Sequence, residues 1–144
     1  IILSARRATD KHLHTYGLGG VTYQPLLLYL GVDSFDSSAF IRSAGKRNYL
    51  MPGFGGEPLK NIDSLTHLPC ACPVCNTRSF EKIRNDRDLL VQHNLWALAL
   101  ELRRFRYVHA SGEDIEAYLD LRFQGNEVTQ RAYHTAKQQV RRLT

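Results

Sequence analysis

The feature that most constrains this chain is a cluster of three cysteines, Cys70, Cys72 and Cys75, followed eighteen residues later by His93. These are all the cysteines of the chain, and an odd number so closely spaced argues against a disulfide framework. Three thiolates and one imidazole are typical donors of a tetrahedral structural zinc site, and sulfur favours zinc over magnesium or calcium. We therefore expect these four residues to bind a structural Zn2+ ion.

The fourth ligand is less constrained than the three cysteines. His93 falls in the early turns of a helix expected over residues 85–109, on a face shared with Trp96 and Leu100. A histidine on an apolar face can be buried for packing alone, so His67, three residues before the first cysteine, is the alternative ligand. For the cysteines themselves, the alternative is three buried or redox-active thiols without a metal.

Length and composition fit one domain with a core of its own. The chain has 144 residues, of which 43% are hydrophobic and 23% charged. No apolar stretch approaches the roughly 20 residues that span a bilayer, and the start lacks the basic-then-apolar pattern of a secretory leader. Together with metal-binding thiolates, this predicts a cytoplasmic protein with no membrane segment.

The chain carries a net charge of +5, which permits a polyanionic partner such as nucleic acid. Solvated helix faces are the alternative use of these cations. The clustered basic residues are Arg42, Lys46 and Arg47, then Arg103, Arg104 and Arg106, then Arg141 and Arg142.

The first third of the chain predicts a strand, a helix and a second strand. Residues 13–16 fit a short strand, residues 17–20 a glycine-rich turn, and residues 23–30 an apolar helix with Pro25 in its first turn. A second strand begins at Val32, and strands joined by such a crossover lie parallel. The turn lacks the spacing of a dinucleotide-binding loop, so its glycines indicate close approach to a flat ligand or to a neighbouring strand.

Two aspartates, Asp33 and Asp36, stand at the end of the second predicted strand. Residues three apart in an extended chain point to opposite faces, so they form no obvious acid–base pair. We expect one to be structural and one chemical. Capping of a turn or helix, together with Ser37 and Ser38, is the alternative role for Asp36.

The rest of the chain predicts an irregular region followed by helices. Residues 42–69 are rich in glycine, proline and polar residues, and predict an excursion held by the metal, with a short strand at 49–51 and a loop at 52–56. The longest helix is predicted over 85–109, with Asn85 as its cap, and two further helices follow at about 115–124 and 128–143. A capping box from Ser111 to Asp114 should begin the first of these. The apolar stripe of the longest helix would be Leu95, Leu98, Leu102 and Phe105.

Four stretches together resemble the tRNA-guanine transglycosylases, which exchange a guanine in nucleic acid for a 7-deazaguanine base. They are residues 16–19 (Tyr-Gly-Leu-Gly), 30–37 (Leu-Gly-Val-Asp-Ser-Phe-Asp-Ser), 70–75 (Cys-Ala-Cys-Pro-Val-Cys) and 93–95 (His-Asn-Leu). They occur in the family's order, and the resemblance covers residues 10 to 108 approximately. The Cys-Pro-Val-Cys form is more similar to the archaeosine-type branch than to the queuine-type branch. Bacterial relatives that insert 7-deazaguanines into DNA resemble this chain in the same four stretches.

The family fold is a (β/α)8 barrel with a zinc-binding insertion near its C-terminal end, so the resemblance implies an α/β fold. Residues 1–48 would be the last βα units of the barrel, residues 49–110 the zinc-binding subdomain with the long helix, and residues 111–144 a helical tail. The family's acid–base aspartate and main base-recognition residues lie on earlier strands, which this chain lacks. The chain would then be the C-terminal portion of a larger enzyme, or one part of a split one, and inactive alone.

The resemblance also implies roles for single residues. Asp36 would be the nucleophile that attacks C1′ of the target nucleotide and holds the sugar covalently until the new base attacks. The residues that wall the base pocket would be Gly17, Leu18 and Gly19. The residues that contact the nucleic-acid backbone would be Arg42 and, as weaker candidates, Lys46 and Arg47.

The expected partners are tRNA as acceptor, a 7-deazaguanine base as substrate, and the remainder of the barrel or a partner chain. Family members often dimerise through the zinc region, so the resemblance also implies a homodimer there. Two alternatives stand beside this function: a DNA-guanine transglycosylase, and a non-catalytic zinc-stapled accessory module that binds nucleic acid. A zinc hydrolase is disfavoured because four protein ligands leave the metal no open position.

Overall fold

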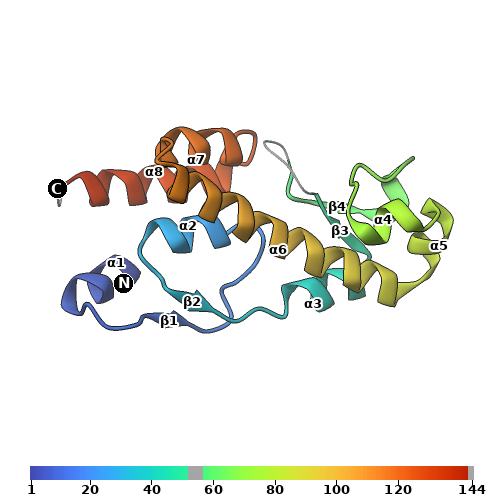
Figure 1. Cartoon of the computed structure of the whole chain (residues 1–144), viewed down its shortest axis with the longest axis horizontal. Helices are drawn as coiled ribbons and strands as arrows, with labels where there is room; N and C mark the ends of the chain where they lie inside the picture. The colour runs from blue at the N-terminus through green and yellow to red at the C-terminus, as the bar shows by residue number, and fades with distance from the viewer. Residues whose placement is uncertain (52–56, 143–144) are drawn as a thin grey trace.

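The computed structural model describes residues 1–51 and 57–142, so the loop expected at 52–56 lies outside the described residues. The long helix α6 runs through the molecule, with α4 and α5 at one end and both termini toward the other (Figure 1). The elements are α1 (Ile2–Ala8), β1 (His14–Thr15), α2 (Gln24–Tyr29), β2 (Ser34–Phe35), α3 (Ala39–Gly45), β3 (Asn48–Leu50), β4 (Leu59–Asn61), the 3-10 helix η1 (Ile62–Ser64), α4 (Pro73–Thr77), α5 (Phe80–Asn85), α6 (Arg87–Ser111), α7 (Ile115–Phe123) and α8 (Glu127–Arg141). Within these ranges no helix combines the length and apolar character that crossing a membrane requires.

Two small sheets accompany the helices. Strands β1 and β2 pair in parallel, with His14 opposite Ser34, and α2 connects them, which confirms the predicted strand–helix–strand unit. Strands β3 and β4 form an antiparallel pair, with Leu50 opposite Leu59. Over the described residues each sheet has two strands, so the fold is richer in helix than the expected α/β class and closes no barrel by itself.

The buried face of α6 differs from the predicted apolar stripe. Leu98 and Phe105 are buried as expected, but Leu95 is 50% exposed. The face that packs inward also carries His93, Asn94 and Glu101, each of which is at most 2% exposed. The apolar pattern could not reveal these three, because their burial depends on polar partners elsewhere in the chain. The buried residues of α6 are Leu90, His93, Asn94, Ala97, Leu98, Glu101, Phe105 and Val108.

The predicted caps of two helices differ from those in the structure. Asp86, rather than Asn85, caps α6, because its carboxylate accepts the N–H groups of Asp88 and Leu89. Likewise α7 is capped by Asp114 alone, since Ser111 is still the last residue of α6. In both cases the helix begins at the residue after the aspartate, so the capping carboxylate fixes where the helix starts.

Asn94 ties α6 to two other elements. Its Oδ1 accepts the Leu50 N–H at 2.9 Å, and its Nδ2 donates to the carbonyl oxygens of Asn48 at 2.9 Å and Phe40 at 3.3 Å. The side chain is fully buried. One amide therefore serves two backbone groups of β3 and one in the first turn of α3.

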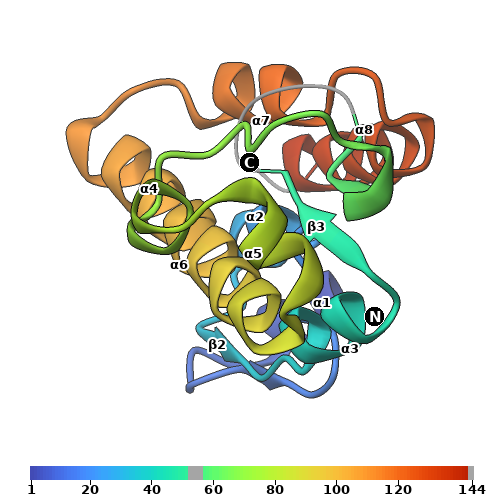
Figure 2. The ribbon, with the colours of Figure 1, turned by 90° about the vertical axis from the view of Figure 1, so that its right-hand side faces the viewer.

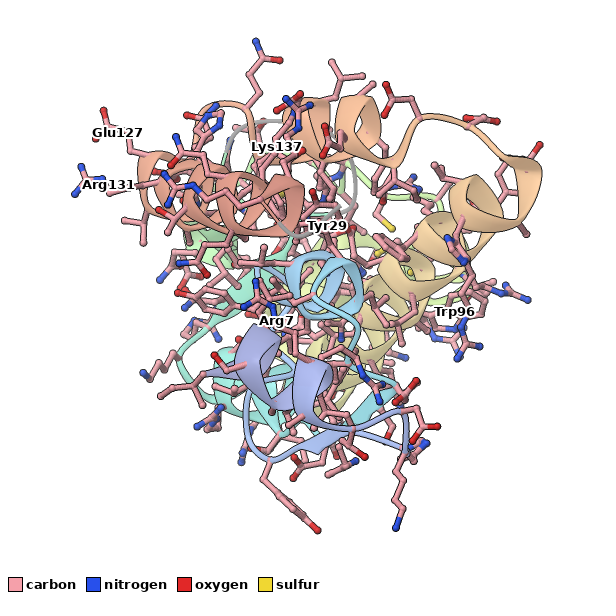
Figure 3. The ribbon with its side chains drawn as sticks, turned by 90° about the vertical axis from the view of Figure 1, so that its left-hand side faces the viewer. Arg7, Tyr29, Trp96, Glu127, Arg131 and Lys137 are labelled. Carbon is pink, nitrogen blue, oxygen red and sulfur yellow. The ribbon has the colours of Figure 1, made fainter. Side chains whose placement is uncertain are left out.

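The tail helices α7 and α8 pack on α2 around a core of Leu26, Phe105, Leu119, Phe123 and Tyr133. A polar cluster supports this contact, which Figure 3 shows with Tyr29 and Lys137 between the helices and Arg131 at the outer surface of α8.

Glu116 is the centre of that polar cluster. It pairs with Arg141, accepts the Tyr29 hydroxyl at 2.8 Å and lies 3.3 Å from Lys137 Nζ. The hydrogen bond from Arg141, followed by those from Tyr29 and Lys137, lowers the pKa of Glu116 to about 2. Of the predicted basic pair at the end of the chain, Arg141 is thus engaged within the fold.

Replacing Asn94 by Ala tests the link between α6 and β3. The substitution removes all three of these hydrogen bonds and leaves the buried Leu50 N–H without its partner, so we expect the free energy of unfolding to fall by about 2–4 kcal/mol in urea denaturation. Gln92→Ala, at an exposed position of the same helix, is the matched control and should change stability by less than about 0.5 kcal/mol. Equal losses in the two variants would contradict the assignment.

Candidate functional site

The four predicted metal ligands come together where α4 meets α6. Figure 2 shows these two helices side by side, seen from the end of the molecule that carries α4 and α5. The ligand atoms of Cys70, Cys72, Cys75 and His93 all lie within 4.8 Å of one another. Cys72 and Cys75 are buried and Cys70 is partly buried. This donor set could hold one metal ion, which confirms the grouping expected from the cysteine spacing.

The short helix α4 arranges the cysteines. Cys72 is extended and caps the helix, with its sulfur accepting the Cys75 N–H at 3.4 Å. Pro73 occupies the first turn, where a missing N–H costs no helical hydrogen bond. Cys70 lies just before this turn, and its sulfur accepts the Cys72 N–H at 3.3 Å. Backbone N–H groups thus point at two of the three sulfurs and favour their ionised forms.

His93 is oriented by two neighbours from β3. Its Nε2 lies 3.0 Å from the Leu50 carbonyl oxygen, which can only accept, so Nε2 carries the proton. The other nitrogen, Nδ1, then faces the sulfurs of Cys75 at 3.2 Å and Cys72 at 3.5 Å with a free lone pair. The Tyr49 ring stacks on the imidazole with 3.7 Å between centroids, and its hydroxyl lies 3.3 Å from the Cys75 sulfur. Such outer contacts fix the tautomer and direction of a ligating histidine.

The three thiols influence one another strongly. A hydrogen bond from the Cys75 thiol lowers the pKa of Cys70 to about 3, and the same bond, with burial, raises the pKa of Cys75. Burial is the main cause that raises the pKa of Cys72. In this cluster one thiolate forms readily and discourages the other two, and a bound divalent cation would compensate all three charges. The chemistry of the donors therefore fits a soft metal ion.

His67 lies outside this cluster. It is exposed, and its Nδ1 lies 3.2 Å from the Thr66 hydroxyl. Of the two histidines that the sequence leaves open, the structure therefore places His93 with the cysteines.

Removing each histidine in turn tests this choice. His93→Ala should reduce the metal that copurifies with the protein by at least half, measured as metal per chain by inductively coupled plasma mass spectrometry, because only three donors remain. His67→Ala should retain the full amount. Loss of metal in the His67 variant with retention in the His93 variant would reverse the assignment.

Asp36 follows β2 and is held by the glycine-rich turn (residues 17–20) that follows β1. The Gly17 N–H donates to Asp36 Oδ1 at 2.5 Å, and the Gly19 N–H donates to the Asp36 carbonyl oxygen at 3.3 Å. The Asp36 N–H in turn donates to the Thr15 carbonyl oxygen at 3.4 Å. The carboxylate is exposed at the carboxyl ends of two parallel strands, and among the described residues Oδ2 has no hydrogen-bond partner.

The other aspartate has a structural role. Asp33 Oδ2 accepts the Leu13 N–H at 2.7 Å and binds the Arg6 guanidinium at 2.8 Å. The Leu13 N–H, with a smaller effect of Arg6, lowers the pKa of Asp33. The two aspartates thus differ in environment, because Asp33 joins α1 to the first strand through an ion pair with Arg6, while Asp36 has no ion pair among the described residues.

Position 19 requires glycine because the backbone there packs closely against the neighbouring strand. A Cβ atom there would lie 2.7 Å from the Asp36 carbonyl oxygen and from Phe35 Cδ2, and 2.8 Å from Ser37 Cβ. Of the two explanations for these glycines, the structure shows approach to the strand. Gly17 has a φ of +71°, which favours glycine, and the Leu18 side chain between them is 47% exposed.

Adding a methyl group to this turn tests its packing. Gly19→Ala should lower the melting temperature by several degrees, because the added Cβ must displace the backbone of Asp36. Gly20→Ala is the matched control, since a Cβ there meets nothing within 4 Å; its melting temperature should stay the same or rise slightly. Equal melting temperatures for the two variants would show that the close approach is absent in solution.

The predicted backbone-contacting residues lie in different environments. Arg42 and Lys46 are exposed at the end of α3, the helix that leaves the Asp36 loop. Arg47 instead binds Asp63 through two hydrogen bonds of 2.6 Å, and Arg84 also contacts that carboxylate. The structure therefore leaves Arg42 and Lys46 exposed to an external ligand and engages Arg47 within the fold.

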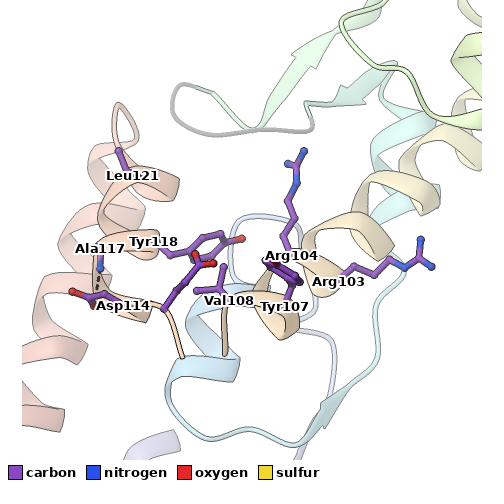
Figure 4. A pocket seen from close by; sticks show the side chains of 9 residues that line it. Arg103, Arg104, Tyr107, Val108, Asp114, Ala117, Tyr118 and Leu121 are labelled. Carbon is purple, nitrogen blue, oxygen red and sulfur yellow. Dashed lines mark hydrogen bonds between the residues drawn. The ribbon is translucent and has the colours of Figure 1, made fainter. Parts of the chain in front are cut away.

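A hollow that the sequence did not indicate lies between α6 and α7 (Figure 4). Its volume is about 770 Å3 and it shares no residue with the metal centre or the glycine-rich turn. It is lined mostly by apolar side chains of these two helices, which a short segment connects. The spacing of these residues in the sequence did not predict that no other element would cover them. The lining residues include Arg103, Tyr107, Val108, Ala117, Tyr118 and Leu121.

Comparison with known proteins identifies curated relatives. No protein-family model matches the chain. A tRNA-guanine(15) transglycosylase of Haloferax volcanii is 33% identical over 122 residues, which are 80% of this chain and 23% of the relative. The enzymes of the same name from Pyrococcus abyssi and Aeropyrum pernix are each 32% identical over 78% of this chain, which covers 20% and 23% of those relatives. The chain thus spans about a fifth of the length of the curated relatives it matches.

Proposed function

We propose that this chain, which is homologous to part of the tRNA-guanine transglycosylases, is the portion of such an enzyme that carries the nucleophile and a structural zinc centre. The observation that carries the proposal is the position of Asp36. Its carboxylate is exposed at the carboxyl ends of two parallel strands and is oriented by the Gly17 N–H. Active sites of (β/α)8 barrels lie at that end of the strands.

We assign β1, α2 and β2 to the last βα units of a (β/α)8 barrel, within residues 1–48. A two-stranded parallel sheet has two unpaired edges and is not stable by itself. The segments next to these strands in the chain carry exposed apolar side chains: Tyr16 after β1 is 82% exposed, Tyr23 before α2 44% and Ile41 in α3 43%. The earlier strands and helices of a barrel, on the same polypeptide or on a partner chain, would cover such surfaces. Residues 49–110 form the zinc-binding subdomain with α6, and residues 111–144 the helical tail.

In the proposed reaction Asp36 acts as the nucleophile. An oxygen of its carboxylate attacks C1′ of the target nucleotide, the bond from C1′ to the guanine nitrogen breaks, and guanine leaves with a proton supplied by the rest of the barrel. A 7-deazaguanine base then gives the proton of its attacking nitrogen back to the group that protonated guanine, bonds to C1′ and releases the carboxylate. The hydrogen bond from Gly17 holds Oδ1, so Oδ2 is the oxygen that faces the sugar.

We propose tRNA as the acceptor, because the relatives are named for tRNA. The target base must leave its stack to reach Asp36, and Gly17, Leu18 and Gly19 would then form one wall of its pocket. Exposed cations on the helix after the nucleophile would contact backbone phosphates, with Arg42 and Lys46 better placed than Arg47, whose guanidinium binds Asp63.

We propose zinc as the metal because three sulfurs and one imidazole nitrogen match its structural sites. Four protein ligands leave no position for substrate, so the ion would stabilise residues 49–110 without entering the chemistry. The same region offers a surface for the homodimer that the family resemblance implies. Trp96 is 36% exposed there and lines two hollows that Pro73 also lines.

Covalent trapping tests the role of Asp36. The intact gene product that contains this chain is incubated with tRNA, and the adduct is separated on a denaturing gel. Asp36→Asn should reduce the adduct by at least a hundredfold, because an amide is a poor nucleophile toward C1′. Asp33→Asn is the matched control and should trap tRNA within threefold of the unmodified protein, since its carboxylate is bound within the fold.

Undiminished trapping by the Asp36 variant would overturn the proposed role. Unchanged binding of tRNA by both variants, with no adduct from any form of the protein, would instead favour the non-catalytic accessory module.

A further inference from the structure

Gln24 lies directly beneath the glycine-rich turn, at the start of α2. It is 2% exposed, and its Nε2 donates to the Gly19 carbonyl oxygen at 3.1 Å. The carbonyl can only accept, so the direction of the amide is fixed. Its Oε1 is buried and has no hydrogen-bond partner among residues 1–51 and 57–142, which the structure describes. Burying an amide for a single hydrogen bond is unfavourable compared with an apolar side chain of equal size, so packing does not explain this residue.

The bond from Gln24 completes a chain of contacts that ends at the carboxylate of Asp36. Gly19 is held from both sides, because its carbonyl oxygen accepts from Gln24 and its N–H donates to the Asp36 carbonyl oxygen. Two residues earlier in the same turn, the Gly17 N–H holds Asp36 Oδ1. Gly19 has no space to shift toward β2, since a Cβ atom there would already overlap Asp36, Phe35 and Ser37. The position of Gly19 therefore sets where Gly17 can direct its N–H.

We propose that Gln24 is a positioning residue for the nucleophile, acting through the glycine-rich turn. It fixes the Gly19 peptide, and the turn then presents the Gly17 N–H to Oδ1 and leaves Oδ2 directed outward. The inference rests on the proposed function of Asp36. Gln24 itself does not reach the substrate, because its side chain is buried below the turn.

The test uses the intact gene product and two variants of Gln24. Gln24→Met retains the length of the side chain and removes the donor, and Gln24→Leu removes the donor with a branched apolar side chain. The rate constant of covalent adduct formation with tRNA should fall at least tenfold in both, because a misdirected carboxylate attacks C1′ less often. The dissociation constant for tRNA should stay within twofold, since no binding group is removed.

Tyr133→Phe is the matched control for losing one buried hydrogen bond elsewhere. The Tyr133 hydroxyl donates to the Glu116 carbonyl oxygen at 3.2 Å within the helical tail. This variant should form adduct at the unmodified rate. An unmodified rate in both Gln24 variants, or an equal loss in the Tyr133 variant, would overturn the proposal.

A second measurement does not depend on catalysis. Hydrogen exchange of a peptide that covers residues 17–20, followed by mass spectrometry, should speed up in Gln24→Met and remain unchanged in Tyr133→Phe. Unchanged exchange in Gln24→Met would overturn the positioning role even if the variant were inactive. If Asp36→Asn still forms adduct while exchange speeds up in Gln24→Met, the proposed function fails and the link from Gln24 to the turn stands.

Discussion

Two adjacent buried residues of α6 hold Leu50 by both of its backbone groups. His93 donates to its carbonyl oxygen and Asn94 accepts from its N–H. The first contact directs the imidazole at the cysteine cluster, and the second fixes β3 against the long helix. Because both bonds come from a single helical turn, the metal centre and the β3–β4 sheet are positioned together. The same helix carries Phe105 into the core with α2 and the tail, so α6 connects the metal end to the strand–helix–strand unit.

The Asp36 end is organised differently, since backbone groups do most of the positioning. The carboxylate is oriented by one N–H from a turn that contains three glycines. Such a turn approaches the neighbouring strand more closely than side chains would permit. Asp33 and Asp36 also differ in the groups that bind them. A backbone N–H and an arginine both bind Asp33 through Oδ2, whereas Asp36 accepts one backbone N–H, extends past the strand end and forms no ion pair within the described residues.

Some of this architecture could be predicted from the sequence, and the failures have a common cause. The metal ligands were predictable because few donor sets form a tetrahedral site, and the parallel strand pair because a short apolar helix separated two apolar stretches. The stripe on α6 was wrong at Leu95 because the buried face includes polar side chains such as His93 and Asn94, whose partner Leu50 lies more than 40 residues earlier. Strand β4 was missed because all three of its residues are exposed and show no alternation. Gln24 was missed because only the folded turn reveals its contact with Gly19.

The most direct test of the account is guanine exchange by the intact gene product. Labelled guanine is supplied with either tRNA or duplex DNA, and the label incorporated into each nucleic acid is counted. The account predicts label in tRNA. A free labelled guanine can attack the covalent intermediate formed at Asp36 and so replace the unlabelled guanine that left. Label in DNA alone would contradict tRNA as the acceptor and identify a DNA-modifying enzyme. Label in neither, with metal bound and the protein folded, would contradict a transglycosylase and leave the accessory module.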